Sequence, residues 1–500
     1  MITTHDVERI LKEHGLLRRA DKNEKAELIQ WVTCDSREVI PGTLFICKGA
    51  EFLPEYLLEA VACGCIGYMS EERRGTPKQV RGFIVKDIRM AMAVISAAYF
   101  EYEPGKPKLT GVTGTKGKTS TAWYLKAMLD EWQKEKGGRE TGLISSVENF
   151  DGNKKMDAVM TTPEAPVLHE IIAKVKESGS EYMTIETSSQ ALKYHRVAGL
   201  HFEVGIFLNI SEDHISPHEH RDFEDYFNAK LSIFRQCGTA CVNLDSDHAR
   251  RILKEAEKSK RVVTFGQHPE AQVRYNILHE KDGKLTFMVT CPQFTEQFSL
   301  KMRGSFNIEN AVAAITAAYV YGVPVRCMKK ALEETSVPGR MEVFVSPDQK
   351  ICVIVDYAHN QLSFQKLFQT VFQEYRSFQK IITVFGCPGG KAFNRRKELG
   401  ALAGMFSDHV YLTSDDPGIE SGLKIASEIG NYVEMAGGTW NSVTDRRTAI
   451  RCAMEEARTD KEKTLVLVLG RGSEKFQKIG RRLYAYPSDS NIVREMMANY

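Results

Sequence analysis

The sequence predicts an α/β protein of three domains, the second with a mostly parallel sheet and the third of Rossmann-like character. The chain has 500 residues, and a single domain usually holds about 100 to 150, so one hydrophobic core cannot account for it. Beyond residue 105, apolar β-branched runs alternate with segments of helical length, which is typical of parallel sheets covered by helices. The alternation stops and restarts near residue 340, which separates the second domain from the third.

The three predicted domains span residues 1–105, 106–340 and 341–500. The first contains short helical and strand-like patterns and ends at EYEPGKP, where two prolines and a glycine break the pattern. The second holds the strand candidates KLTGVT, EYMTIET and EVGIFLNI, with helical patterns between them. The third begins after SVPGRME and holds ICVIVDYA, KIITVFG, HVYLTSD and TLVLVLG.

Overall composition excludes several classes of partner. The 67 Lys and Arg nearly balance the 65 Asp and Glu, so no global field attracts nucleic acid or an anionic membrane surface. The N-terminal segment lacks a signal-peptide pattern, and no window has the roughly eighteen uninterrupted apolar residues of a membrane helix. We therefore expect a cytoplasmic monomer that neither binds nucleic acid nor inserts into a membrane. The 11 scattered cysteines lack repeated CxxC spacing, which favours reduced thiols over zinc ligands.

A glycine-rich loop gives the strongest local signal. The run GVTGTKGKTST, residues 111–121, follows a strand pattern and opens a helical one, which is the context of a phosphate-binding loop. Gly114 and Gly117 allow a tight turn whose backbone N–H groups point at an anion. Lys118 can neutralise the β and γ phosphates, and Thr119 can offer its hydroxyl to Mg²⁺. A loop that only caps the helix is the alternative, and the loop alone does not identify the phosphate acceptor.

Three polar side chains further along extend the candidate site. Glu186 ends the predicted strand EYMTIE, where a carboxylate could hold Mg²⁺ directly or through water; an ordinary helix-start residue is the alternative. His214 in NISEDH could be a metal ligand, and Lys230 in YFNAK could be a charge partner. Taken alone, both would more often be surface groups on a loop and a helix.

A series of short motifs covers residues 35–480. In chain order they include GVTGTKGKTST, TTPE, ETSSQAL, LNISEDH, YFNAK, FNIENAVAA, VPGRME, DYAHN, FGCPGG, SDDPG and GRGSEKFQ. Their order and approximate spacing resemble those of the Mur ligase family. The set is most similar to the family members that add the third residue of the peptidoglycan stem peptide.

By this resemblance, the central domain binds ATP and Mg²⁺. Thr119 and Glu186 would serve a first Mg²⁺, and His214 would bind a second. Lys230 matches the lysine that is carbamylated in the family, where CO₂ converts an ammonium into an anion that can ligate Mg²⁺. Lys118, Lys230, Glu186 and His214 are thus the implied catalytic residues. The residues implied to contact ATP are Gly114, Thr115, Lys116, Gly117, Lys118, Thr119, Ser120, Asn310 (adenine), Arg340 (at the hinge to the last domain), Asp356 (ribose) and His359.

The resemblance also makes the first domain a uridine-nucleotide-binding α/β domain. The run CDSREVIPGTLF is similar to the family segment that contacts the uridine end of the nucleotide sugar. By itself, it would be a turn stabilised by side-chain-to-backbone bonds. The residues implied to hold UDP-MurNAc-L-Ala-D-Glu are Ser36, Thr161, Thr162, Ser188 and Arg196.

The last domain is implied to bind the incoming amino acid. In family members that take meso-diaminopimelate, the first motif of this site ends in Arg, which can clamp the distal carboxylate, whereas this sequence has Gly418. L-lysine, or another amino acid without that second carboxylate, is therefore favoured over meso-diaminopimelate. Arg471, Arg395 or Arg396 could still reach a second carboxylate from neighbouring segments. The residues implied to bind the amino acid are Asp415, Asp416, Gly470 and Glu474.

The implied activity is amide ligation through an acyl phosphate. The γ-phosphoryl group of ATP moves to the D-glutamyl carboxylate, the amine attacks, and phosphate leaves, with positioning and charge compensation supplied by a closing site. Gln190, where the family usually has His, and PGGKAFNRR, in place of a charged run containing Asp, leave a diverged ligase with another acceptor open. A folylpolyglutamate-synthase-like ligase is disfavoured by the long segment before the phosphate loop. A non-catalytic nucleotide-binding scaffold is disfavoured because Lys118, Glu186, His214 and Lys230 are all retained.

Overall fold

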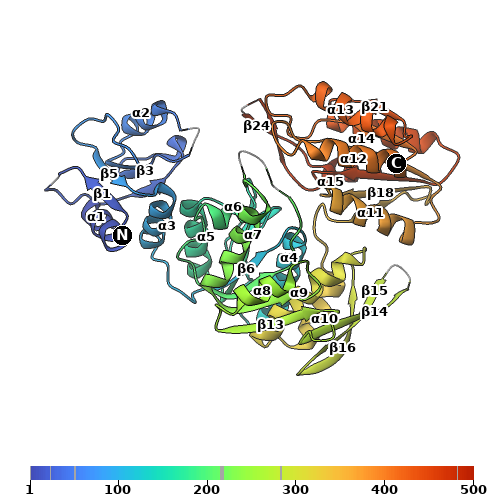
Figure 1. Cartoon of the computed structure of the whole chain (residues 1–500), viewed down its shortest axis with the longest axis horizontal. Helices are drawn as coiled ribbons and strands as arrows, with labels where there is room; N and C mark the ends of the chain where they lie inside the picture. The colour runs from blue at the N-terminus through green and yellow to red at the C-terminus, as the bar shows by residue number, and fades with distance from the viewer. Residues whose placement is uncertain are drawn as a thin grey trace.

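The computed structural model describes residues 2–22, 24–49, 52–213, 215, 219–281, 284–480 and 482–499. Figure 1 shows three lobes in chain order, coloured blue, then green and yellow, then orange and red. We call them the N-terminal, central and C-terminal lobes. The sheet changes between Tyr99 and Lys108, and again between Glu334 and Glu342. The predicted α/β architecture is confirmed, and the domain limits at residues 105 and 340 remain a prediction.

The N-terminal lobe is a helix-backed sheet of order β1-β5-β4-β3-β2, with β1 antiparallel to β5 and the other pairs parallel. Thr3 and Asp6 form a capping box that starts α1, and this helix buries Val7 and Leu11 in the lobe's core. Its elements are α1 (Thr4–Glu13), β1 (Leu17–Ala20), β2 (Trp31–Thr33), the 3₁₀ turn η1 (Ser36–Glu38), β3 (Thr43–Ile46), α2 (Pro54–Ala62), β4 (Gly67–Ser70), β5 (Arg81–Val85) and α3 (Ile88–Tyr99).

The central lobe has a long sheet of order β16-β15-β14-β13-β12-β11-β6-β10-β7-β8-β9. Its middle is parallel, with β6 between β10 and β11. Side chains alternate along β6: Leu109 packs with α5 to α8, whereas Val112 packs with α4, α9 and α10, so helices cover both faces. The elements are β6 (Lys108–Thr113), α4 (Lys118–Glu135), β7 (Gly142–Ile144), β8 (Glu148–Phe150), β9 (Lys155–Asp157), α5 (Ala165–Glu177), β10 (Tyr182–Glu186), α6 (Ser189–Lys193), β11 (Phe202–Phe207), α7 (Phe223–Leu231), η2 (Ser232–Gln236), β12 (Cys237–Asn243), α8 (Ala249–Ala256), β13 (Arg261–Gly266), β14 (Val273–Lys281), β15 (Lys284–Cys291), β16 (Phe294–Leu300), α9 (Phe306–Tyr321) and α10 (Val325–Glu334).

Antiparallel strands extend both edges of this sheet, which the sequence did not predict. The strands β8 and β9 follow β7 at one edge, and β15 and β16 follow β14 at the other. Along β16, exposed or half-buried residues separate the buried ones, so the run lacks the continuous apolar pattern of the parallel strands. The apolar signal that identified the middle strands is therefore weak at these edges.

The C-terminal lobe is an α/β unit with helices on both faces of its sheet, in agreement with the predicted Rossmann-like character. Its sheet has the order β17-β18-β22-β19-β20-β21 and is parallel except where β17 pairs with β18. Helices α11 to α13 pack on one face, and α14 and α15 on the other. The elements are β17 (Glu342–Val345), β18 (Ile351–Asp356), α11 (Gln361–Glu374), β19 (Lys380–Phe385), α12 (Asn394–Phe406), β20 (His409–Leu412), α13 (Gly422–Met435), β21 (Trp440–Ser442), α14 (Arg446–Thr459), β22 (Thr464–Leu469), the hairpin β23 (Phe476–Ile479) and β24 (Arg482–Ala485), and α15 (Asp489–Ala498).

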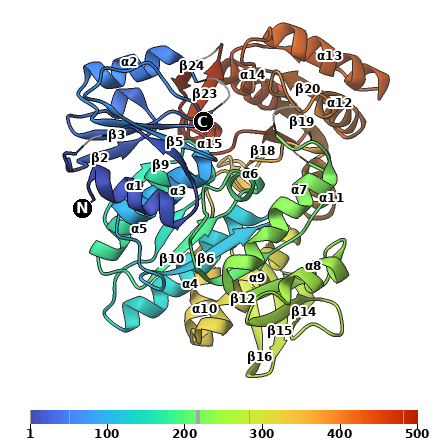
Figure 2. The ribbon, with the colours of Figure 1, turned by 60° about the vertical axis from the view of Figure 1, so that its left-hand side comes forward.

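The outer lobes lie on the same side of the central sheet, above β6 and β10 in Figure 2. Parallel strands end at a common edge, so the loops after β6 and β10 lie together there. Within the described residues, no helix is long and apolar enough to cross a membrane.

Candidate functional site

The predicted phosphate loop connects β6 to α4. Gly114 has φ 156° and Gly117, the N-cap of α4, has φ 86°. A Cβ atom at Gly117 would lie 2.0 Å from Asn310 Oδ1, and one at Gly114 would lie 2.8 Å from Leu208 Cβ. Both positions therefore need glycine, for conformation and for space.

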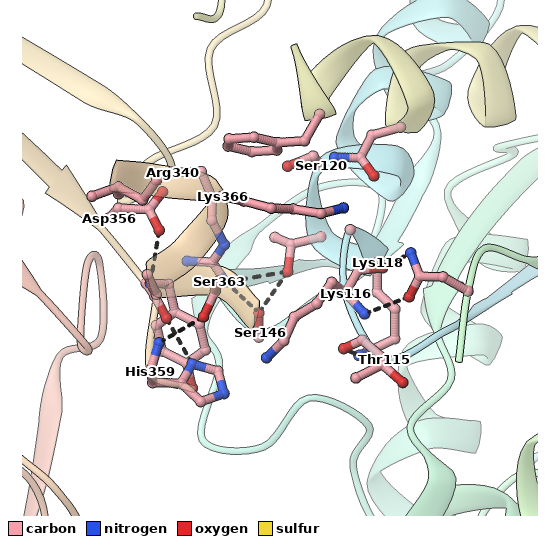
Figure 3. A pocket seen from close by; sticks show the side chains of 18 of the residues that line it. Thr115, Lys116, Lys118, Ser120, Ser146, Arg340, Asp356, His359, Ser363 and Lys366 are labelled. Carbon is pink, nitrogen blue, oxygen red and sulfur yellow. Dashed lines mark hydrogen bonds between the residues drawn. The ribbon is translucent and has the colours of Figure 1, made fainter. Parts of the chain in front are cut away.

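A cavity of about 210 Å³ opens at this loop, between the central and C-terminal lobes (Figure 3). Its walls come from the loop, from the strand end at Glu186, from α9, and from the start of the C-terminal lobe. Gly114 and Lys230 lie next to it, because Lys230 Nζ donates a hydrogen bond of 2.8 Å to the Gly114 carbonyl. The residues predicted for ATP or metal that line it are Thr115, Lys116, Gly117, Lys118, Thr119, Ser120, Glu186, Asn310, Arg340, Asp356 and His359.

Two lysines converge on the same carbonyl of the loop. Lys118 Nζ donates to the carbonyl oxygens of Gly114 at 2.9 Å and Thr115 at 3.2 Å, beside the bond from Lys230. Burial, and then the nearby Lys118 charge, hold the pKa of Lys230 well below its usual value. Burial also lowers the pKa of Lys118, although Glu186 and Asp213 oppose the shift. Lys230 is thus a buried amine whose neutral form is more favoured than that of a free lysine.

Glu186 forms a compact oxygen cluster with two hydroxyls. Its carboxylate accepts hydrogen bonds from Ser146 N at 2.7 Å and from Thr119 Oγ1 at 3.1 Å. Arg340 Nη2 donates to both hydroxyls, Thr119 Oγ1 and Ser146 Oγ, at 3.2 Å each. Burial raises the pKa of Glu186, while the Lys118 charge works against it. Among the described residues, no group of three His, Cys, Asp or Glu side chains forms a metal site, and His214 lies outside those residues.

The C-terminal lobe supplies the opposite wall. Asp356, at the end of β18, accepts hydrogen bonds from the backbone N–H groups of Met341 and Ala358, both at 2.7 Å. The Arg340 guanidinium lies over the Tyr357 ring, 4.2 Å from its centroid. Burial, followed by the Lys116 and Arg395 charges, lowers the pKa of His359 well below its usual value, which favours the neutral imidazole.

The residues predicted for the sugar peptide gather beside Glu186, except for Ser36. Thr162 Oγ1 donates to the Glu186 carbonyl at 2.7 Å and accepts from Ser188 N at 3.1 Å. Arg196 donates to the Thr162 carbonyl at 3.2 Å and pairs with Glu164 at 3.0 Å. Thr161 lines the cavity itself. Ser36 lies in η1 of the N-terminal lobe, where its hydroxyl donates to Glu59 at 2.8 Å.

The residues predicted for the amino acid surround Arg471. This guanidinium, 1% exposed, pairs with Asp415 at 2.9 Å, Asp416 at 2.7 Å and Glu474 at 3.1 Å. Burial raises the pKa of Glu474 to about 7, and the carboxylate accepts a hydrogen bond of 2.7 Å from the Tyr357 hydroxyl. Gly470 follows β22, and a Cβ atom there would lie 3.0 Å from Asp415 Oδ2.

Each of the three arginines considered as alternative carboxylate clamps already has an acidic partner. Arg471 has the three carboxylates above, Arg395 pairs with Asp213 at 2.7 Å, and Arg396 pairs with Glu420 and Glu428. The position of Gly418 is open, since a Cβ atom there would meet nothing within 4 Å, but its φ of 58° disfavours a side chain. The geometry agrees with the absence of a free guanidinium clamp in this part of the described structure.

Family comparisons match the chain over most of its length. Residues 112–318 match the Mur ligase middle domain, and residues 339–472 match the Mur ligase glutamate ligase domain. The chain is 34% identical over 510 residues to UDP-N-acetylmuramyl-tripeptide synthetase of Lactobacillus acidophilus, covering 98% of this chain and 96% of the relative. The chain belongs to the Mur ligase family.

A second sequence relative and a solved structure are also similar to this Mur ligase. UDP-N-acetylmuramoyl-L-alanyl-D-glutamate–L-lysine ligase of Enterococcus faecalis is 36% identical over 452 residues, which cover 89% of this chain and 87% of the relative. The solved structure of MurF ligase from Thermotoga maritima in complex with ADP has a TM-score of 0.63 at 19% identity, covering 95% of this chain and 98% of that one. These matches confirm the family resemblance and the fold.

Several cavity residues of this Mur ligase were not predicted from its sequence. Ser146 follows β7, and Lys366 lies on α11, from which its side chain extends into the cavity (Figure 3). Phe306 and Glu309 come from the start of α9. Phe306 and Glu309 lie within the quoted motif FNIENAVAA, so they could have been found beside Asn310. Ser146 and Lys366 carry no local pattern, and only the fold brings them to the site.

Proposed function

We propose that this Mur ligase is an ATP-dependent amide ligase that joins L-lysine to the D-glutamyl carboxylate of UDP-MurNAc-L-Ala-D-Glu, a step of peptidoglycan synthesis. The observation that carries the proposal is the cavity shared by two lobes, where the phosphate loop faces Asp356 and Arg340. Such a cavity lets a nucleotide held by one lobe react next to an amine brought by the other. Full-length relatives are named as the tripeptide synthetase and the L-lysine ligase, which supports this acceptor and this amine.

ATP would lie along the phosphate loop, with its adenine near Asn310 and its ribose near Asp356. The loop offers backbone N–H groups, the N-terminus of α4 and the Lys118 ammonium to the phosphates. A MurF ligase of the same fold has been solved in complex with ADP, which supports binding of an adenine nucleotide by this fold. Asp356 is held by two backbone N–H groups, so its carboxylate is oriented before any ligand binds.

Glu186 and Thr119 fit a Mg²⁺ ion beside the phosphates. Mg²⁺ prefers hard oxygen ligands, and the two side-chain oxygens are 3.1 Å apart. The raised pKa of Glu186 means that its buried anion is incompletely compensated, a deficit that a bound cation would relieve. Bound Mg²⁺ would neutralise phosphate oxygens as the γ-phosphoryl group moves. We retain His214 as a proposed ligand of a second ion.

Lys230 fits carbamylation because its amine is favoured in the neutral form. A neutral amine can attack CO₂, which gives an N-carboxylate and releases one proton, whereas an ammonium cannot. The product would place an anion beside Lys118, where it would attract the Lys118 ammonium and Mg²⁺. The repulsion between the Lys230 and Lys118 ammonium groups, which contributes to the lowered pKa of Lys230, would thereby be removed.

The sugar peptide would bind between the N-terminal lobe and Glu186, with Ser36 toward the uridine and Thr161, Thr162, Ser188 and Arg196 toward the peptide. Arg196 is held by Glu164 and by the Thr162 carbonyl, so its guanidinium is fixed beside Thr162, where the peptide would bind. The D-glutamyl carboxylate would then accept the γ-phosphoryl group, and the acyl phosphate would be open to the amine.

The charges around Arg471 favour L-lysine over meso-diaminopimelate. Asp415, Asp416 and Glu474 outnumber the single Arg471 among them, which suits a cationic side chain. Among the described residues, the three arginines considered for this site are already paired with carboxylates, so a second carboxylate would lack their support, and an unpaired buried charge costs several kcal/mol.

Phosphate release tests the proposal. We expect the purified protein to release phosphate from ATP only when UDP-MurNAc-L-Ala-D-Glu and an amino acid are both present, with a higher kcat/KM for L-lysine than for meso-diaminopimelate. Release that is independent of the sugar peptide would contradict the acceptor, and a preference for meso-diaminopimelate would contradict the amino acid.

A further inference from the structure

Asp213 joins the two lobes that form the nucleotide cavity. It lies in the central lobe after β11, and its carboxylate accepts hydrogen bonds from two groups of the C-terminal lobe. Arg395 Nη2 donates to Oδ1 at 2.7 Å, and Asn360 Nδ2 donates to Oδ2 at 2.7 Å. Both partners stand at helix starts, Asn360 as the N-cap of α11 and Arg395 in the first turn of α12.

The same carboxylate also faces the phosphate loop. Lys116 Nζ donates to Asp213 Oδ2 at 3.4 Å. The backbone of Lys116 is fixed from both sides by one amide side chain: its N–H donates to Asn209 Oδ1 at 2.9 Å, and its carbonyl accepts from Asn209 Nδ2 at 3.2 Å. Asp213 therefore connects the C-terminal lobe to a loop residue whose backbone cannot shift freely.

Burial strengthens the ion pair between Asp213 and Arg395. The side chains of Asp213 and Arg395 are 5% and 12% exposed, so water screens their attraction little. Another ion pair between the two lobes, Lys475 with Asp157 at 2.6 Å, is about half exposed, and pairs of that kind contribute little.

We propose that Asp213 is a positioning residue that latches the C-terminal lobe onto the phosphate loop, so that lobe closure and nucleotide affinity are coupled. The proposal rests on the proposed nucleotide site. Closure by this latch brings Asp356, Arg340 and Lys366 opposite the loop, because all of them line the same cavity. It also gives the unusual run PGGKAFNRR a role: Arg395 serves the latch, while Arg396 pairs within its own lobe with Glu420 and Glu428.

A double-mutant cycle on the full chain tests the latch. The variants are Arg395→Gln, Asp213→Asn and the pair together, with Arg395→Lys as the conservative variant and Arg396→Gln as the control from the same helix. We expect Arg395→Gln to raise the Kd for ADP with Mg²⁺ about tenfold in the wild-type background and less than about twofold in the Asp213→Asn background. Arg395→Lys should restore most of the affinity, and the effect of Arg396→Gln should be the same in both backgrounds.

Two further readouts separate positioning from general damage. In steady-state kinetics, Arg395→Gln should raise KM for ATP and leave KM for the sugar peptide unchanged. In small-angle scattering of the ligand-free protein, Arg395→Gln should be more extended than wild type, and Arg396→Gln should not. Equal effects of Arg395→Gln in both backgrounds, or identical behaviour of the two arginine variants, would overturn the latch. Absence of ADP binding by the wild type, with the scattering difference intact, would instead overturn the nucleotide site and leave the latch standing.

Discussion

Replacing Gly117 by alanine should reduce nucleotide affinity while leaving a folded protein. Gly117 has φ 86° and caps α4, and an added Cβ atom would lie 2.0 Å from Asn310 Oδ1. The Asn310 amide must then move, which breaks its bond of 3.3 Å to Asn307 Oδ1 and removes it from its place on the cavity wall. Asn310 is the residue that we propose for adenine.

Gly117→Ala should cost free energy in two ways, one in folding and one in nucleotide binding. An alanine in the left-handed region costs about 1 to 2 kcal/mol of folding stability, with or without nucleotide. Loss of the Asn310 contact costs about 1 to 2 kcal/mol of binding, or about a tenfold rise in Kd. Gly137 provides a matched control, since it follows the other end of α4 with φ 69° and a Cβ atom there would meet nothing within 4 Å.

The assay combines urea unfolding with calorimetric titration of ADP and Mg²⁺. Gly137→Ala should lose less stability than Gly117→Ala and keep wild-type affinity, because it has the strain without the clash. Wild-type ADP affinity in Gly117→Ala would show that Asn310 does not contact the nucleotide. An equal loss of affinity in both variants would show that the effect is general.

Variants at three other positions test separate parts of the proposed site and fold. Lys118→Ala should abolish phosphate release in a folded protein, because it removes a charge aimed at the phosphates; near-normal turnover would contradict the ATP assignment. Lys230→Ala should lose most activity, with partial rescue by acetate, and Lys230→Arg should stay inactive because a guanidinium cannot form the carbamate; full activity of the Arg variant would refute carbamylation. His169 is buried, its pKa is lowered to about 4, and its ring nitrogens have no hydrogen-bond partner in the described structure. Its neutral form contributes stability above pH 6.5 that is lost as the pH falls through 4, about 3 kcal/mol in all. Urea unfolding of His169→Phe at pH 7 and pH 4.5 should show a smaller loss on acidification than wild type, and an equal loss would refute this.

The sequence predicted best those parts of the site that stand at the ends of buried strands. The glycine loop after β6, Glu186 at the end of β10 and Asp356 at the end of β18 each carry a local apolar signal that fixes their position in the fold. Because β6 and β10 pair in parallel, the glycine loop and Glu186 lie at the same edge of the sheet, as the apolar strand pattern predicts.

The parts that the sequence did not predict depend on contacts between distant segments. Arg395 was considered as a clamp for a substrate carboxylate, but it is paired with Asp213, 182 residues away in the chain. No spacing rule indicates such a partner. Lys366 likewise reaches the cavity only because α11 packs beside it. The edge hairpins of the central sheet escaped prediction because their apolar pattern is weak.

Product identification tests the central claim most directly. The purified protein is given ATP, Mg²⁺, UDP-MurNAc-L-Ala-D-Glu, and equal amounts of L-lysine and meso-diaminopimelate, and the nucleotide-sugar products are identified by mass. We predict one main product, the sugar peptide extended by L-lysine through an amide bond, with ADP and phosphate formed in equal amounts. A product extended mainly by meso-diaminopimelate would contradict the amino-acid assignment, and an unchanged sugar peptide under conditions where ATP is consumed would contradict the proposed ligase reaction.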